Sequence, residues 1–327
     1  MLKKQLKNIL MWTIAIGIFA YLFQHYPLSQ VLKAFNHVKK LHFFGFSLAY
    51  FAFIYVWDAW VMQKVMGRFA HQVSLKDMLV ARGVTYLIMI INYPAAQASY
   101  AYFLKRRYNI PLFQAFSIFT FILAIDFLWV MSLAFVGTYV SHAELAGFDL
   151  SSWVQHTTLT GYAFFALWLC FWRRWPKTLF AQLDKLACLR KLRQQHIFFA
   201  FETAQVFDYL KVFFLRTPIH FTIMLSFYVV AQTFGASIPF AQILGNIPIV
   251  FFIGSLPLTP GGLGTSNLAM VELLSPHLSS PIFATGELSA KEMMFTLTLL
   301  WMFTNYLFKF LIGTFFLRRV SKELFSA

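Results

Sequence analysis

Apolar runs recur from one end of the chain to the other, and short polar or charged stretches separate them. A transmembrane helix needs about 20 mostly apolar residues, because an α-helix rises about 1.5 Å per residue. Apolar runs that suit helices lie at 6–24, 41–63, 77–92, 94–104, 112–140, 157–172, 217–236, 241–257, 265–275 and 291–317. The pattern predicts an all-α, polytopic transmembrane helical bundle with about six spans.

Two consecutive pairs of these runs are too short to cross a bilayer separately. Each pair is interpreted as a broken helix that forms a re-entrant hairpin, one over 77–104 and the other over 241–275. The breaks fall at PAAQAS (94–99) and PGGLGT (260–265), which share a pattern of proline, two small residues, a variable residue, a small residue and a hydroxyl residue. This match indicates an internal repeat.

The composition supports a membrane protein. Of the 327 residues, 59% are hydrophobic and 12% are charged, which excludes an ordinary water-soluble domain of this length. No polar stretch is long enough to bury a core of its own, so residues 1–327 are interpreted as a single integral membrane domain. Its parts are an N-terminal half (1–140), a connecting span with a basic cytoplasmic segment (141–216) and a C-terminal half (217–327).

The net charge of +15 fits a membrane protein whose Lys and Arg residues gather on the cytoplasmic side, and no nucleic-acid-binding motif accompanies it. Stretches with clusters of Lys and Arg are predicted to be cytoplasmic, namely 64–76, 105–107, 173–193 and 318–322. The stretches 141–156 and 275–290 contain neither residue and are predicted to be external. We therefore expect a multi-pass protein of the inner (plasma) membrane with both termini in the cytoplasm.

Three segments need separate placement. The residues PLSQVLKAFNHVKK (27–40) carry lysines where the alternation of sides requires an external loop, so they are expected to form a short interfacial helix. Residues 197–216 are placed along the inner surface, because Asp208 and Lys211 interrupt them and both flanks are basic. The basic stretch 172–196 is expected to lie on anionic lipid of the inner leaflet.

With these assignments, the hairpin 77–104 begins and ends on the cytoplasmic side and the hairpin 241–275 on the external side. This is an inverted-topology repeat, which secondary transporters use with the substrate site near the membrane midplane. Backbone groups outside a helix at that depth must be buried in protein or face water, and glycine lets the backbone approach a ligand closely. The following half-helix directs free N–H groups at the cavity, which suits an anionic group such as a phosphate.

Polar and small residues around the two breaks are the candidates for substrate binding. The polar ones can bind a lipid headgroup, or they can only cap the half-helices. A further alternative is that the glycine and alanine residues simply allow close helix crossing. The candidates are Asn92, Pro94, Gln97, Ser99, Pro260, Gly261, Gly262, Gly264, Thr265, Ser266 and Asn267.

Charged residues inside the apolar runs form a second group of candidates. Asp126 lies midway along 112–140, where an unpaired carboxylate is costly, so it is expected to face the interior with Arg82 or Lys309 as its partner. Such a residue serves either a structural ion pair or a gating or proton-linked role. Asp58 is expected to lie at the membrane interface.

Several of these features carry a family resemblance. They are the PGGLG motif followed by a half-helix, the segment from NYP (92–94) to LKRR (104–107) followed by a helix with Asp126, and a final span that ends near Gly313. The chain resembles the transmembrane domain of lysylphosphatidylglycerol synthases and related flippase-like integral membrane proteins over most of its length. The resemblance implies translocation of a polar-headed lipid between leaflets.

The resemblance also implies charged residues that this chain lacks. The family's Glu after each tip is replaced by Ser99 and Asn267. Its Glu-Arg pair before the membrane aspartate is replaced by Ile122 and Leu123, and its Arg in the last span by a residue near Met302. The family's headgroup chemistry therefore does not transfer directly.

Residues and resemblance together predict a membrane transporter that translocates a polar-headed lipid or a lipid-linked intermediate. The expected partners are membrane lipids with an anionic phospholipid or isoprenoid-linked headgroup. The alternatives are a non-transporting scaffold that assists a lipid- or glycan-modifying enzyme, and a membrane-bound transferase. No enzyme activity, cofactor or metal is expected, because loop residues of suitable chemistry match no ligand or catalytic spacing. These residues are His142, Glu144, Asp149, His156 and His277.

Overall fold

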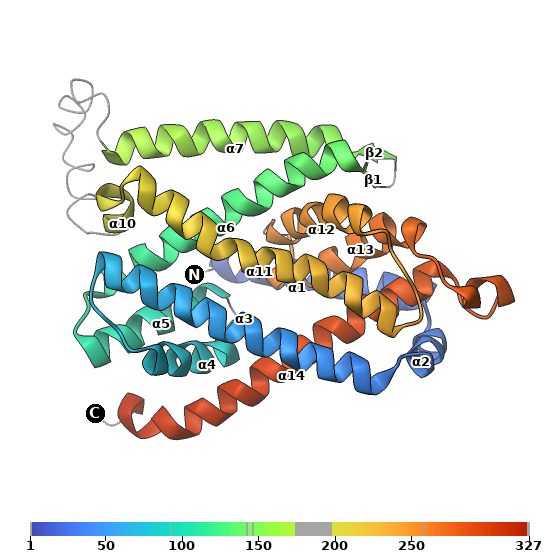
Figure 1. The fold of residues 1–327 in the computed structure, drawn as a ribbon, viewed down its shortest axis with the longest axis horizontal. Coiled ribbons are helices and arrows are strands. Elements are labelled where there is room, and N and C mark those ends of the chain that lie inside the picture. Colours follow the sequence, from blue (N-terminus) through green and yellow to red (C-terminus); the bar gives the residue numbers. More distant parts are fainter. Residues whose placement is uncertain are drawn as a thin grey trace. The chain divides into compact units, whose positions relative to one another are not determined.

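The computed structural model describes residues 2–91, 93–141, 143–145, 147–173, 198–256 and 258–325, and this part of the chain is almost entirely helical (Figure 1). The α-helices are α1 (Leu2–His25), α2 (Leu28–Asn36), α3 (Lys40–Phe69), α4 (Leu75–Ile91), α5 (Tyr93–Tyr108), α6 (Leu112–Val140), α7 (Leu150–Arg173), α10 (Phe199–Thr203), α11 (Val206–Thr233), α12 (Phe240–Ser255), α13 (Thr265–Leu274) and α14 (Ala290–Phe325). The shorter elements are the paired strands β1 (Glu144–Leu145) and β2 (Phe148–Asp149) and the 3-10 helices η1 (Pro260–Gly262), η2 (Ser275–His277) and η3 (Pro281–Thr285).

Within the described residues, α3, α6, α11 and α14 are long and apolar enough to cross a membrane. A fifth span results if α1 and α2, which are bent by 71° at their junction, are taken as one broken span. Helix α7 has the length of a span but lower hydropathy, because its first turns carry Ser151, Ser152, Gln155 and His156. The chain is therefore an all-α polytopic membrane protein. The bend also turns α2 away from the line of α1, as an interfacial helix requires.

The prediction that residues 197–216 lie along the inner surface is wrong for 206–216, and residue 197 lies outside the described residues. Residues 206–216 form the first three turns of α11, which continues without interruption to Thr233. Asp208 was one of the charged residues that argued against a membrane span here. Its buried carboxylate is compensated, because it accepts two hydrogen bonds of 2.9 Å from Arg68. A paired carboxylate is far less costly to bury than an isolated one.

The chain divides into two compact units, each assembled from three stretches. Unit 1 consists of Met1–Phe51, Val130–Thr158 and His220–Leu307, and unit 2 of Ala52–Trp129, Leu159–Ile219 and Phe308–Ala327. Each unit contains one of the two predicted hairpins. Helices α12 and α13 pack together in unit 1, and α4 and α5 pack together in unit 2 (Figure 1).

The hairpin of unit 2 is clasped at its base. Ser74 caps the start of α4, because its hydroxyl accepts from the Asp77 backbone N–H at 3.1 Å and donates to Asp77 Oδ2 at 2.7 Å. Asp77 also accepts a hydrogen bond from the Tyr108 hydroxyl, and Arg107 Nε lies 2.9 Å from its Oδ1. The start of α4 and the end of α5 are thus held together, as a re-entrant hairpin requires.

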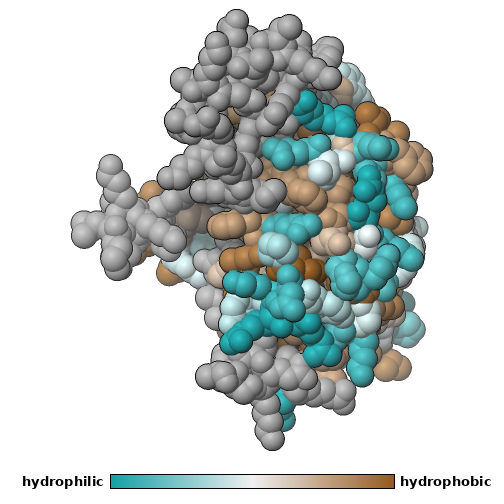
Figure 2. Space-filling view, turned by 90° about the vertical axis from the view of Figure 1, so that its left-hand side faces the viewer, coloured by the Kyte–Doolittle hydropathy of each residue, from teal (hydrophilic) through white to brown (hydrophobic). Residues whose placement is uncertain are grey.

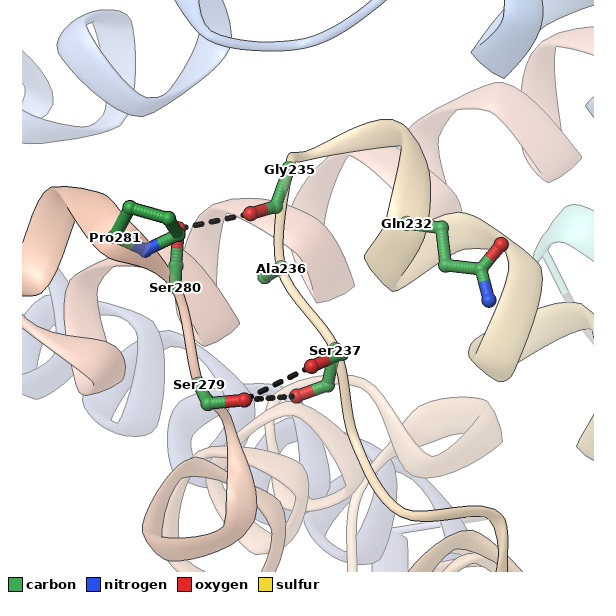
Figure 3. Close-up of a pocket in the computed structure, with 7 residues that line it drawn as sticks. All are labelled: Gln232, Gly235, Ala236, Ser237, Ser279, Ser280 and Pro281. Carbon is green, nitrogen blue, oxygen red and sulfur yellow. Dashed lines mark hydrogen bonds between the residues drawn. The ribbon is translucent and has the colours of Figure 1, made fainter.

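The hairpin of unit 1 is closed by backbone pairing instead. The N–H of Ser237 donates to Ser279 O at 2.9 Å, and the N–H of Ser279 donates to Ser237 O at 3.0 Å. The Ser280 hydroxyl donates to Gly235 O at 2.9 Å beside this bridge (Figure 3). An open groove of about 430 Å³ lies here, but its three serine hydroxyls are already bonded within the chain and no charged residue lines it.

Candidate functional site

The break in the second hairpin is a glycine-rich turn inside unit 1. Gly261, Gly262 and Gly264 have φ of 61°, 75° and 83°, in the left-handed region that glycine enters without strain. Pro260 opens the 3-10 turn η1, whereas α13 begins five residues later at Thr265. Pro260 therefore does not open the second half-helix, because the glycine-rich turn lies between this proline and the start of α13.

Two of these glycines are packed tightly against neighbouring helices of unit 1. A Cβ on Gly262 would lie 2.8 Å from the carbonyl oxygen of Gly254 in α12, and a Cβ on Gly264 would lie 3.2 Å from Ile18 in α1. Gly261 is exposed and has open space around its Cβ position. The packing interpretation thus explains Gly262 and Gly264, and only Gly261 presents its backbone to an open side.

The polar side chains of this break are largely satisfied within the chain. Thr265 Oγ1 donates to Gly262 O at 3.1 Å and lies 3.1 Å from Thr259 Oγ1. Asn267 Nδ2 donates to Thr298 Oγ1 of α14 at 3.2 Å. Neither caps α13, whose N-cap is Gly264 without a side-chain bond. The N–H groups in the first turn of α13 have no intrahelical acceptor, since helix geometry leaves the first four without one.

The first break, in unit 2, is described less completely. Asn92 lies outside the described residues, and Pro94 belongs to the first turn of α5, where its missing N–H costs nothing. Ser99 Oγ donates to Ala96 O at 2.8 Å, a bond within its own helix. Gln97 is 9% exposed, and no described residue donates to its buried Oε1. Gln97 is the predicted polar residue whose environment most resembles an incomplete binding site.

Four charged side chains of unit 2 are in contact at a different place. Arg216 of α11 donates from Nε and Nη2 to the two carboxylate oxygens of Asp126 in α6, both at 2.7 Å. Its Nη1 donates to Asp58 Oδ1 of α3. Arg82 of α4 places Nε 2.6 Å from Asp58 Oδ2, in a charge contact that is not aligned as a hydrogen bond. We call these four residues the charge network.

The charge network is formally neutral, and Asp58 and Arg216 at its centre are buried whereas Arg82 and Asp126 are partly exposed. Arg216 lies about 15 Å from the start of α11 and Asp58 about 16 Å from the end of α3, at 1.5 Å of rise per residue. Asp58 is 2% and Arg216 7% exposed. Removing one member of such a network leaves a buried charge uncompensated, at a cost of about 3–5 kcal/mol.

The pairing within the charge network corrects the predicted partner of Asp126. Asp126 is held by Arg216, a residue that the surface placement of 197–216 had removed from consideration, and Arg82 contacts Asp58. Asp58 sits between two arginines, Arg82 and Arg216. Lys309, the other predicted partner, lies in α14 of unit 2 with Nζ 5.9 Å from the centre of the Tyr86 ring. The sequence feature that could have placed Arg216 inside a span is the apolar run, which continues on both sides of this residue.

The loop residues considered for acid-base or metal chemistry have structural contacts. Asp149 caps α7, accepting from the Ser152 N–H at 3.0 Å and from the Ser152 hydroxyl at 2.6 Å. His156 Nδ1 lies 2.7 Å from Ser152 O. His142 is outside the described residues. Over the described ranges, no three His, Cys, Asp or Glu side chains are placed to hold a metal ion.

Comparison with known protein families shows which family the chain belongs to. Residues 8–313 match the family described as the lysylphosphatidylglycerol synthase transmembrane region. The chain belongs to this family. No curated protein and no solved structure matches it.

The family match runs through both hairpins and through all four residues of the charge network. It confirms the resemblance read from the PGGLG motif, and it identifies the chain as an integral membrane protein. In this family member, Ile122 is buried in the apolar core of unit 2 at the place where the resemblance implies a charged pair.

Proposed function

We propose that this protein moves a polar-headed lipid, or a lipid-linked intermediate, between the leaflets of the inner membrane. The observation that carries the proposal is the charge network, in which two carboxylates and two guanidinium groups from α3, α4, α6 and α11 are in contact inside unit 2. Charged residues within membrane-crossing helices are costly and mark substrate or ion pathways in membrane proteins. Well-packed apolar residues would hold the same helices together without that cost.

The sharing of Arg216 between two carboxylates gives the charge network a way to exchange partners. A headgroup phosphate can replace Asp58 or Asp126 on an arginine, since guanidinium binds phosphate and carboxylate with the same forked geometry. A headgroup amine can pair with the carboxylate that is released. When the headgroup carries both groups, every charge stays compensated during passage, which keeps the barrier low in a medium of low dielectric constant.

The two hairpins complete the proposal at a larger scale. We propose that they form an inverted repeat with bases on opposite membrane faces, both termini being cytoplasmic. That both breaks border one shared chamber stays a prediction. The protein is proposed to leave the lipid chemically unchanged, so it is not an enzyme.

One observation favours a second function. Gly262 and Gly264 are packed against α12 and α1, and the side chains of Thr265 and Asn267 are bonded within unit 1. A break sealed in this way suits a non-transporting scaffold that assists a lipid- or glycan-modifying enzyme.

Transport is tested by reconstituting the protein in vesicles that contain fluorescent lipids with different headgroups. A membrane-impermeant quencher then reports how fast labelled lipid leaves the inner leaflet, and mass spectrometry reports whether the lipid is modified. We expect the wild type to accelerate the movement of at least one polar-headed lipid and to leave its mass unchanged. No acceleration for any headgroup would establish the scaffold, and a changed mass would establish a transferase.

The role of the charge network is tested with Arg216→Lys and Asp126→Asn, each compared with Arg106→Gln on the exposed end of α5. Lysine keeps the charge but loses the forked contact with Asp126. We expect both network variants to lower the transport rate at least tenfold, which corresponds to about 1.4 kcal/mol in the barrier, and the control to keep the wild-type rate. If the folded network variants transport normally, the network is only a structural brace.

A further inference from the structure

A notch lies between the end of α3 and the beginning of α11, both in unit 2. Arg68 and the buried carboxylate of Asp208 form its floor through two hydrogen bonds of 2.9 Å. Asp208 Oδ2 also accepts from the backbone N–H of Gln205 at 2.8 Å, so both carboxylate oxygens are engaged. The walls carry Lys64 from α3 and Lys211 from α11. We call this region the basic notch.

The basic notch has an excess of positive charge. Arg68 and Asp208 neutralise one another, and the ammonium groups of Lys64 and Lys211 remain. Both lysines are exposed, and Lys64 Nζ lies 5.7 Å from the centre of the Trp60 ring. Two cations from separate helices that line one notch attract an anion such as a phosphate.

An apolar stripe on α11 adjoins the basic notch. Phe207, Leu210 and Phe214 follow one face of the helix at spacings of three and four residues, and Phe207 and Phe214 are 70% and 67% exposed. Lys211 lies within this stripe, so a cation and an apolar surface are presented side by side. Figure 2 views this end of unit 2, where hydrophilic residues gather among apolar ones.

We propose that the basic notch binds an anionic phospholipid of the adjacent leaflet, with its headgroup phosphate between Lys64 and Lys211 and an acyl chain along the stripe. A soluble anion would need only the two cations, whereas the stripe provides the contact area for a lipid chain, at about 0.8 kcal/mol per buried methylene group. The site differs from the charge network and does not depend on transport.

The test measures the thermal unfolding of the full chain in detergent with added lipid. Phosphatidylglycerol is compared with phosphatidylcholine at equal concentration, and inorganic phosphate serves as a separate probe. The double variant Lys64→Gln/Lys211→Gln is compared with Lys76→Gln/Lys105→Gln, which removes two exposed lysines elsewhere in unit 2. We expect phosphatidylglycerol to raise the unfolding temperature of the wild type and of the control variant, and the increase to fall by half or more in the notch variant.

Other outcomes overturn the proposal. An equal loss in both double variants would show general surface attraction, and an equal increase with inorganic phosphate would show an ion site without lipid. Phe214→Ser, which shortens the stripe without touching the cations, provides a second readout. It must weaken the effect of phosphatidylglycerol, and an unchanged effect excludes the acyl-chain contact. Because binding is the readout, none of these results bears on whether the protein transports lipid.

Discussion

Gly262 is the residue in the second hairpin that is most tightly constrained. Its φ of 75° requires a conformation that other residues rarely adopt, and its Cβ position is blocked by the backbone of Gly254 and the hydroxyl of Ser266. Gly286, which follows η3, has nearly the same φ of 73° but open space around its Cβ position. A comparison of substitutions at these two glycines therefore separates the effect of backbone strain from the effect of close packing.

We expect Gly286→Ala to lower the free energy of unfolding by about 1 kcal/mol, from strain alone. Gly262→Ala is expected to lower it by about 1–3 kcal/mol more, because the methyl group meets backbone atoms that cannot move aside cheaply. Chemical denaturation in detergent measures both values. Equal losses would show that the contact with α12 relaxes and that only φ matters.

At the scale of elements, the two hairpins are closed by different means. The base in unit 2 depends on one carboxylate, Asp77, which receives hydrogen bonds from Ser74 and Tyr108 and pairs with Arg107. The base in unit 1 depends on backbone hydrogen bonds between Ser237 and Ser279. Only the first closure can respond to pH, since only it contains a titratable group.

The contacts of Asp77 that hold the base of the unit 2 hairpin together are expected to weaken in acid. Burial raises the pKa of Asp77, but hydrogen bonds from Tyr108 and Ser74 and the charge of Arg107 outweigh it, so the pKa lies below its ordinary value. A lowered pKa gives stabilisation that is complete above the unfolded-state pKa of about 3.9 and is lost as the pH falls through the folded-state pKa.

We therefore expect Asp77→Asn to lower the unfolding temperature at pH 7 and to match the wild type progressively below about pH 4. Thermal unfolding in detergent across this range measures the difference. The effect is modest because Arg107 is 42% exposed and solvent screens its charge. A difference that stays constant down to pH 3 would mean that Asp77 acts through its shape and not its charge.

At the scale of the whole molecule, the inverted repeat predicts that the bases of the two hairpins lie on opposite sides of the membrane. Lys76 marks the base of the first hairpin, and Ala284 lies in η3 just beyond the second, and both are exposed. In a background without Cys170 and Cys188, single cysteines at these positions report their side through a membrane-impermeant maleimide. We expect Lys76→Cys to react only from the cytoplasm and Ala284→Cys only from outside. Reaction of both from one side would exclude the inverted arrangement.

The sequence by itself determined the membrane class, the helical fold and the positions of both hairpins. These follow from local properties, since apolar length predicts a span, and proline with glycine interrupts a helix wherever it occurs. It also identified Asp126 as a residue that needs a partner, because burying a lone carboxylate is costly in any fold.

The tertiary structure alone decided which residues are paired. Arg216 lies 90 positions from Asp126 and 158 from Asp58, and no periodicity along the chain relates residues so far apart. The same holds for Arg68 and Asp208, which lie 140 positions apart. Their contact compensates the charge of Asp208 near the start of α11, in a segment that the sequence had placed at the surface. A charge in a sequence shows only that compensation is needed, and helix packing determines which opposite charge lies within reach.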